Sequence, residues 1–150
     1  MKKNIITKET LEKIEQCLTR GKFDDAEEFF LNIDNEDIRD LILSYAYNYE
    51  SLLIYSFVLH MKKYSEIFWT ELAIELMLNP LCFIDGAYSI ALYHSRKLLI
   101  LDDKVENLER ILFFSECPEK LIDMAESEFI AKKILKKEPD NKMALRFLNK

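Results

Sequence analysis

Hydrophobic residues recur every three or four positions along most of the chain, the spacing that places them on one face of an α-helix. The first such segment follows Thr7, which can cap a helix, and ends at Gly21, which tolerates the left-handed backbone that often follows a helix. The next begins at Asp24 or Asp25 and extends to Ile33. Two helices are therefore predicted near the N-terminus. Their apolar positions are Leu11, Ile14 and Leu18 in the first and Ala26, Phe29, Phe30 and Ile33 in the second.

Residues 35–64 keep the same period and are long enough for one helix or two abutting helices, with a junction expected near Glu50 and Ser51. Ser65 can then cap a helix that stops before Pro80, because the residue preceding a proline is driven out of the helical region. That helix is expected to bury its apolar face. The positions on this face are Phe68, Trp69, Leu72 and Leu76, and in the preceding segment Tyr45 and Tyr49 are also assigned to the core.

The rest of the chain continues the pattern, with helices predicted at about 86–101, 104–115 and 119–137 and a short one after Asp140. Pro118 marks the end of the second of these. The chain holds only 2 Gly and 3 Pro, so it has few of the breakers that strand-and-turn folds need. Eight or nine helices with connections of two to six residues predict an all-α fold of antiparallel helix pairs.

Length and composition set the class of protein. With 150 residues, 49% of them hydrophobic and 32% charged, the chain suits a single globular domain over residues 1–150. The N-terminal segment lacks the apolar stretch of a signal peptide, and the longest apolar run is too short to cross a membrane. Cys17, Cys82 and Cys117 lie far apart, which argues against a disulfide framework. A soluble, cytoplasmic protein with reduced thiols is expected.

Residues 81–103 concentrate residue types that often carry catalysis, but each has a structural role in the predicted helix. His94 falls within the apolar face and is expected in the core, Asp85 is expected to cap the helix, and Cys82 to act as a small hydrophobe. An active site around Asp85, Tyr88 and His94 is the less favoured alternative, because no nucleophile–base spacing accompanies these residues. No catalytic residue is assigned.

Cofactor and metal chemistry lack their usual sequence signals. A phosphate-binding loop needs clustered glycines, whereas Gly21 and Gly86 are the only two and lie far apart. His60 and His94 are the only histidines, and the chain has neither an HExxH motif nor a pair of nearby cysteines. No cofactor and no metal ligand are predicted.

Two segments of the chain can be aligned with each other at an offset of 36 residues: "ALYHSRKLLILDDK" (91–104) and "SEFIAKKILKKEPDN" (127–141). The segment "KKILKKEPDNKMALRFL" resembles the second helix, the acidic-Pro turn and the following helix of a tetratricopeptide repeat, and "GKFDDAEEFF" resembles its Gly-x-aromatic-x-x-Ala start of a helix. The resemblance implies a tetratricopeptide-like α-solenoid with a concave surface that binds a protein or peptide.

Charge is distributed unevenly along the chain. Residues 1–50 and 51–127 each carry a net charge of −5 and residues 128–150 a net charge of +4, which gives −6 for the whole. The acidic stretch 24–40 has two interpretations: a solvated helix surface, or a binding surface for a basic protein. Tyr47 is expected to point outward as an anchor within that surface. The acidic candidates for partner binding are Asp24, Asp25, Glu27, Glu28, Asp34, Glu36, Asp37 and Asp40.

Nucleic acid is not expected as a partner, because the protein is acidic and the C-terminal lysines suit the last turns of helices without interleaved exposed aromatics. A small acidic helical protein rich in Lys, Asn and Ile resembles bacterial immunity proteins, which neutralise a toxin by direct binding. The sequence therefore favours a non-enzymatic immunity or inhibitor protein with a cognate toxin as its basic partner. The alternative is a tetratricopeptide-like adaptor or chaperone-type peptide binder. The C-terminal basic residues considered for nucleic-acid binding are Lys132, Lys133, Lys136, Lys137, Lys142 and Arg146.

Overall fold

The computed structural model describes residues 6–149, and these residues form nine α-helices and no strand. Residues 1–5, which belong to the segment inspected for a signal peptide, and residue 150 lie outside the described residues. The predicted all-α class is confirmed for the described chain. The helices are α1 (Lys8–Thr19), α2 (Phe23–Glu27), α3 (Asn35–Tyr49), α4 (Leu52–Met61), α5 (Glu66–Leu78), α6 (Ala87–Leu101), α7 (Val105–Glu116), α8 (Met124–Lys137) and α9 (Lys142–Leu148).

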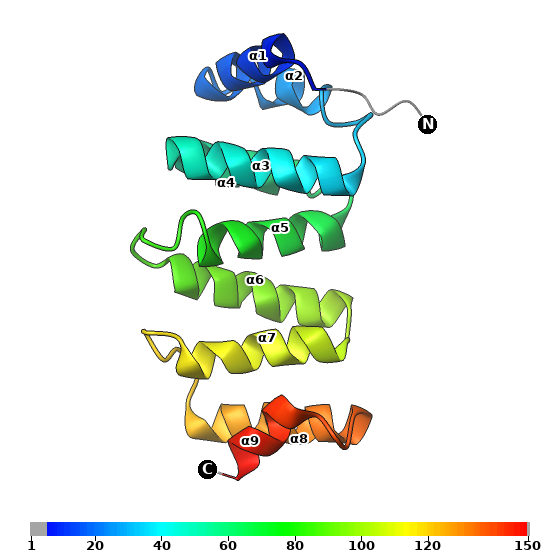
Figure 1. Ribbon diagram of the computed structural model, residues 1–150, viewed down its shortest axis with the longest axis vertical. Helices are drawn as coiled ribbons and strands as arrows, with labels where there is room; N and C mark the ends of the chain where they lie inside the picture. Colours follow the sequence, from blue (N-terminus) through cyan, green and yellow to red (C-terminus); the bar gives the residue numbers. More distant parts are fainter. Residues whose placement is uncertain (1–5, 150) are drawn as a thin grey trace.

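Apart from α2 and α3, helices that follow one another in the chain pack against one another, and Figure 1 shows the helices stacked in sequence order along the long axis. α3 also packs on α5, and α4 contacts both α1 and α2. α1 and α9 therefore lie at opposite ends of the stack (Figure 1). None of these helices is both long and apolar enough to cross a membrane.

Several helix boundaries follow from the capping residues in the sequence. Thr7 accepts a hydrogen bond from the amide of Thr10 at 3.2 Å, as predicted. The predicted junction between α3 and α4 is also confirmed: Glu50 adopts the left-handed conformation, with φ of 49°, and Ser51 caps α4 through the amide of Leu53. Local hydrogen bonding of short polar side chains therefore sets where these helices start and end.

Other boundaries differ from the predictions. α2 ends at Glu27 rather than near Ile33, because the backbone tightens into turns in which the amide of Phe30 bonds to the carbonyl of Glu27. α8 begins at Met124 rather than near 119, since Lys120 takes a positive φ of 46° and Asp123 caps the helix. Three connections are consequently longer than the predicted two to six residues. They span residues 28–34, 79–86 and 117–123.

Asp85 does not cap α6. Gly86 occupies the N-cap position with φ of 81°, and no side chain accepts a hydrogen bond from the first turn of that helix. A left-handed backbone at this position is strained for any residue with a Cβ, which explains the glycine. Ser65 likewise stands at the N-cap of α5 but its side chain makes no capping hydrogen bond.

One connected hydrophobic core runs through the stack. Phe57 of α4 is fully buried and packs against Phe23, Phe30 and Trp69, so it ties the N-terminal helices to α5. The predicted burial of α5 is confirmed. The prediction that Tyr49 lies in the core is wrong, because its side chain is 52% exposed; its ring contacts the half-buried Tyr45 and its hydroxyl donates a hydrogen bond to Glu15 at 3.4 Å. The α5 side chains that were predicted to be buried and are buried are Phe68, Trp69, Leu72 and Leu76.

The two segments that align in the sequence also end their helices in the same way. The amide of Asp102 bonds to the carbonyl of Leu98 at 2.8 Å, and the amide of Glu138 bonds to the carbonyl of Ile134 at 2.8 Å. Leu98 and Ile134 are both fully buried. The alignment thus pairs positions with the same local structure in α6 and α8.

Candidate functional site

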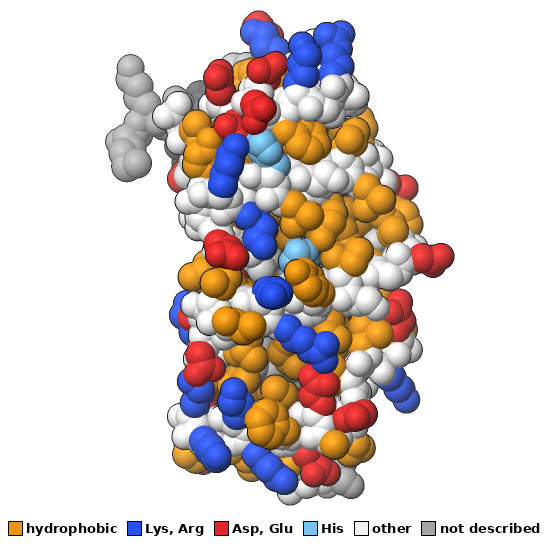
Figure 2. Space-filling model, turned by 180° about the vertical axis from the view of Figure 1, so that it is seen from behind, with side chains coloured by type: hydrophobic (Ala, Val, Ile, Leu, Met, Phe, Trp, Pro, Cys, Tyr) orange, Lys and Arg blue, Asp and Glu red, His pale blue; other side chains and the backbone are white. Residues whose placement is uncertain are grey.

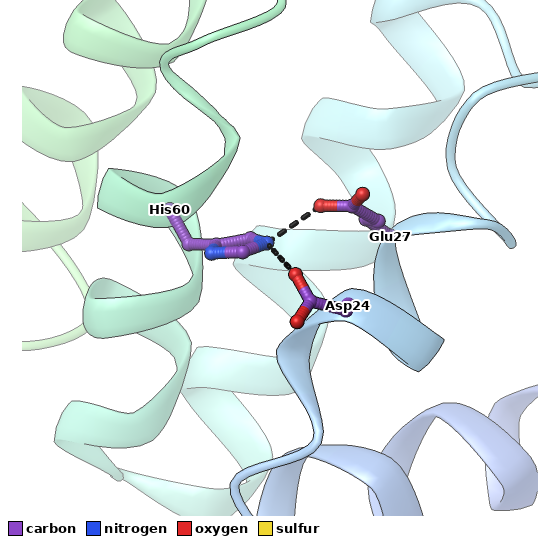
Figure 3. A group of neighbouring side chains, drawn as sticks. All are labelled: Asp24, Glu27 and His60. Carbon is purple, nitrogen blue, oxygen red and sulfur yellow. Dashed lines mark hydrogen bonds and ion pairs between the residues drawn. The ribbon is translucent and has the colours of Figure 1, made fainter.

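The acidic stretch 24–40 does not form a single surface, because its carboxylates point to different neighbours. Glu27 faces α4 and is largely covered, with 13% of its side chain exposed. Its Oε2 lies 2.6 Å from Nε2 of His60 and 2.7 Å from Nζ of Lys63, and its Oε1 accepts a hydrogen bond from the hydroxyl of Tyr64 at 2.8 Å. Figure 3 shows Glu27 and Asp24 converging on His60. Glu27 therefore joins α2 to the end of α4.

These contacts fix the protonation of Glu27. The hydrogen bond from Lys63, followed by that from Tyr64, lowers the pKa of Glu27 to about 2. The same contact with Glu27 raises the pKa of Lys63 and that of Tyr64. The carboxylate is thus negative and fully engaged at neutral pH, so it is not available to a basic partner.

Asp24, Glu27 and His60 are the metal-binding candidate of the described residues, because their ligand atoms lie within 4.8 Å of one another. Carboxylate oxygens and an imidazole nitrogen suit Zn²⁺. A cation already occupies the place, however: the ammonium of Lys63 contacts Glu27 at 2.7 Å and lies 3.3 Å from Nε2 of His60. A metal ion would have to displace this ammonium and break the hydrogen bond between His60 and Glu27. The ammonium of Lys63 therefore offsets part of the negative charge of the two carboxylates without an ion.

Asp25 and Glu28 lie on the other side of α2, next to α1. They line a hollow of about 290 Å³ together with basic side chains of α1 and of the α1–α2 turn. Lysine and arginine in the same hollow oppose the negative charge of these two residues. The basic residues are Lys13, Arg20 and Lys22.

Asp34 and Asp37 belong to the start of α3. Asp34 is its N-cap and accepts a hydrogen bond from the amide of Asp37 at 2.9 Å. Carboxylates in the first turn also favour the helix through its dipole. Both residues therefore have a structural role at the beginning of α3.

Glu36, Asp40 and Tyr47 share one face of α3, since they follow one another at spacings of four and seven residues. All three are exposed, Tyr47 to 60% as predicted, and neither carboxylate has an ion-pair partner among residues 6–149. The neighbouring Arg39 forms an ion pair with Glu75 of α5 at 3.0 Å. We call Glu36, Asp40 and Tyr47 the α3 face.

An open hollow of about 500 Å³ adjoins the α3 face. Glu36 and Asp40 stand at its edge, while Arg39 and Phe68 form part of its lining. Phe68 is buried and Arg39 lies over its ring at 6.0 Å. The hollow therefore combines one aromatic side chain, Phe68, and the guanidinium of Arg39 with two carboxylates that have no ion-pair partner among the described residues.

His94 lies in the core, as predicted, with 3% of its surface exposed. Its Nε2 is 2.6 Å from the hydroxyl of Tyr55 on α4, while Nδ1 has no hydrogen-bond partner. Burial, and then the charge of Lys62, lower the pKa of His94 to about 4. Neither Asp85 nor Tyr88 is hydrogen-bonded to His94 in the described chain. The constellation considered as an alternative active site is not assembled.

Sequence reasoning missed a set of exposed aromatics that alternate with lysines. Tyr93 lies beside Lys97 on α6, and Phe129 beside Lys133 on α8. The expectation that no exposed aromatics accompany the C-terminal lysines is therefore wrong. The i, i+4 spacing in each pair was visible in the sequence, but which helix face turns to solvent was not.

Comparison with models of protein families, with curated proteins and with solved structures finds no match for this chain. The residues themselves therefore carry the functional argument. Within residues 6–149, all three cysteines are free, Cys17 and Cys82 half-buried and Cys117 buried.

Proposed function

We propose that this protein has no chemistry of its own and acts by binding a basic protein through the α3 face. The observation that carries the proposal is a pair of exposed carboxylates, Glu36 and Asp40, that line a hollow with Phe68 and lie on the same helix face as the exposed Tyr47. A lysine or arginine side chain of a partner has an apolar stem that suits the hollow and a charge that suits the two carboxylates.

The α3 face also has the composition of a binding site. Tyrosine supplies a large, rigid contact at low entropic cost, and a helix stripe with charged and aromatic positions can orient a partner. Of the six other acidic residues, Asp34 caps α3 and Asp37 lies in its first turn, Asp24 and Glu27 contact His60 and Lys63, and Asp25 and Glu28 line the α1–α2 hollow. The proposal therefore keeps Glu36, Asp40 and Tyr47 as the contact residues.

The specific form that we propose is an immunity or inhibitor protein that neutralises a cognate bacterial toxin. Its support is the small size, the net charge of −6 and the concentration of unpaired acid on one helix. Negative charge speeds association with a basic partner and disfavours acidic ones. A dedicated inhibitor needs one partner and no active site.

The second candidate is a tetratricopeptide-like adaptor that binds peptide segments. The consecutive packing of helix pairs and the matched helix ends at Asp102 and Glu138 support it. Such an array would bind several proteins through short segments rather than one protein through a folded surface.

Affinity capture from the cells that produce the protein, at low and at high salt, tests both candidates. The variant carries Glu36→Gln, Asp40→Asn and Tyr47→Ala. We expect the wild-type protein to retain one basic protein, less of it at high salt, and the variant to lose it. Retention of several unrelated proteins through short segments would support the adaptor instead.

A matched control carries Glu119→Gln and Asp140→Asn, which remove two exposed carboxylates that also lack an ion pair within the described chain. The control should retain the basic protein as the wild type does. Equal capture by the wild type and the α3 variant would refute the assignment of the α3 face. Toxicity of the retained protein in cells, relieved by co-expression of the wild type, separates an inhibitor from other binding proteins.

A further inference from the structure

Besides the α3 face, a second exposed surface with unpaired charges lies on α6 and α8. The aromatic side chains of Tyr93 and Phe129 are 58% and 62% exposed, and the same two helices also expose Ile100 and Met124. Each ring has a lysine next to it: Nζ of Lys97 is 5.7 Å from the centre of Tyr93, and Nζ of Lys133 is 6.0 Å from the centre of Phe129. We call these four residues the lysine–aromatic face.

The two halves of this face lie on the same side of the molecule. Arg96 of α6 bonds to Glu126 of α8 at 2.8 Å, and Lys137 of α8 bonds to Asp103 after α6 at 2.9 Å. Arg96, Glu126 and Lys137 share the outward stripe of their helices with the lysine–aromatic pairs. The two bridges lie near opposite ends of α8, so the stripes of α6 and α8 lie side by side. Figure 2 shows hydrophobic and Lys or Arg side chains intermixed on the half of the molecule nearer the C-terminus.

The lysines of this face have no acidic partner. Lys97 and Lys133 form no ion pair within residues 6–149, whereas the neighbouring Arg96 and Lys137 are both paired. Lys136, also exposed, is unpaired within the same residues. The face is therefore locally positive on a protein whose net charge is −6.

A hollow of about 440 Å³ lies within the α8 part of the face, with Phe129 and Leu135 as its apolar lining. Three lysines surround it, so an apolar side chain in the hollow would sit among positive charges. Those lysines are Lys132, Lys133 and Lys136.

We propose that the lysine–aromatic face binds an acidic peptide segment that carries apolar side chains. Carboxylates of the segment would pair with Lys97 and Lys133, and an apolar or aromatic side chain would cover Phe129 and enter the hollow. This partner is opposite in charge to the one proposed for the α3 face, and the proposal does not depend on that function.

An acidic segment fits better than a nucleic acid or an anionic membrane. A polyphosphate or an anionic lipid surface would bring dense negative charge against a protein of net charge −6. The carboxylates of Glu126 and Asp103 also border the face, although each is paired. A short segment needs only the few lysines of the face and avoids those carboxylates.

The test uses the full chain and a fluorescent synthetic peptide of alternating glutamate and phenylalanine, with a lysine and phenylalanine peptide of equal length for comparison. Binding is measured by fluorescence anisotropy, and its location by amide chemical shifts of the ¹⁵N-labelled protein. We expect the acidic peptide to bind more tightly, with shifts confined to α6 and α8 and a loss of affinity in salt.

Two variants locate the binding energy. Lys97→Glu with Lys133→Glu should weaken the acidic peptide about tenfold or more, and Phe129→Ala about fivefold. The matched controls are Lys22→Glu with Lys142→Glu, and Phe83→Ala, whose ring is 59% exposed but has no lysine over it. The controls should bind as the wild type does, and circular dichroism verifies that every variant remains helical.

Three outcomes would overturn the proposal. The basic peptide could bind as tightly as the acidic one, or the Lys97 and Lys133 reversal could leave affinity unchanged. Oligouridylate or vesicles of phosphatidylserine could also bind in preference to the acidic peptide, which would assign the face to RNA or to a membrane. The α3 variant should keep full affinity for the acidic peptide, so failure here and failure of the proposed function are distinguishable.

Discussion

The two histidines of this protein lie on two different helices of the stack, α4 and α6, and have opposite environments. His60 lies at the end of α4, where it contacts Asp24, Glu27 and Lys63. His94 lies inside the stack with one hydrogen bond, to Tyr55, and an unpartnered Nδ1.

The difference shows what burial does to one residue type. A protonated His94 would have two N–H donors in the core and a partner for only one, which adds to the cost of burying a charge and agrees with its lowered pKa. His60 is open enough for carboxylates and an ammonium to gather around it. Identical side chains therefore serve as a core residue in one place and as part of a polar link between helices in the other.

The largest expected effect that distinguishes the two histidines is on stability. His94→Ala should lower the free energy of unfolding by about 2–4 kcal/mol, because it leaves a cavity and an unpaired Tyr55 hydroxyl. His94→Gln should cost less, since the amide can reach the same hydroxyl. His60→Ala at the surface should cost less than His94→Ala. Urea denaturation measures all three, and equal losses for the two alanine variants would contradict the comparison.

The pH dependence of stability is the next effect. The pKa of His94 is about 4 in the folded protein against 6.5 for an unperturbed histidine, so between these values the unfolded chain binds more protons. Stability should therefore fall as the pH decreases from about 6.5 to about 4, by up to about 3 kcal/mol. Denaturation curves across this range measure it.

The His94→Gln variant is the control for that pH dependence. It should lose the part of the slope that lies between about pH 6.5 and pH 4, while the part below remains, where Glu27 with its pKa of about 2 takes up a proton on unfolding. An unchanged slope in the upper range would show that His94 is not held neutral by burial.

A smaller effect is expected at the His60 cluster. Glu27→Gln removes the charge that Lys63 and His60 share but keeps the shape of the side chain. We expect a small decrease in melting temperature that shrinks further in high salt, because exposed ion pairs are screened. Glu106→Gln, which alters an exposed carboxylate without an ion pair in residues 6–149, is the matched control. A decrease that does not change with salt would contradict the electrostatic account.

The smallest expected effect is that of Zn²⁺ on the melting temperature of the wild-type protein. We expect Zn²⁺ to raise the melting temperature of the wild type little, because Lys63 already fills the place of a cation. Lys63→Met should bind Zn²⁺ several-fold more tightly, since the repulsion between ammonium and metal ion is removed. Titration calorimetry with both proteins measures the difference, and His60→Ala in the Lys63→Met background should abolish the gain. Tight binding to the wild type would mean that the ion displaces Lys63.

Much of the fold could be predicted because local signals coincide with the apolar period. Thr7, Ser51 and Pro80 mark helix ends by hydrogen bonding or by steric exclusion within a few residues. The end of α2 and the start of α8 were misplaced, because the chain turns before Phe30, whose ring packs on Phe57 of α4, and at Lys120, whose φ is positive. Asp85 looked like a cap, but the backbone turns at Gly86 instead.

The candidate site was only partly predictable. Eight acidic residues looked equivalent in the sequence, yet Glu27 is engaged by His60, Lys63 and Tyr64, residues more than thirty positions away. Tyr47 pointed outward as predicted, and Tyr49 did so against the prediction. The period of apolar residues along a helix shows which residues share a face, but it does not show which face packs against another helix.

The sequence by itself determined the all-α class, most helix boundaries and the core position of His94, because these depend on periodicity and on short-range capping. Only the tertiary structure decided which charges remain without a partner. Lys63 meets Glu27 because α4 packs on α2, and the lysine–aromatic pairs of α6 and α8 lie on one side because both helices pack on α7. Whether a charge is paired depends on distances between helices, which a local pattern does not encode.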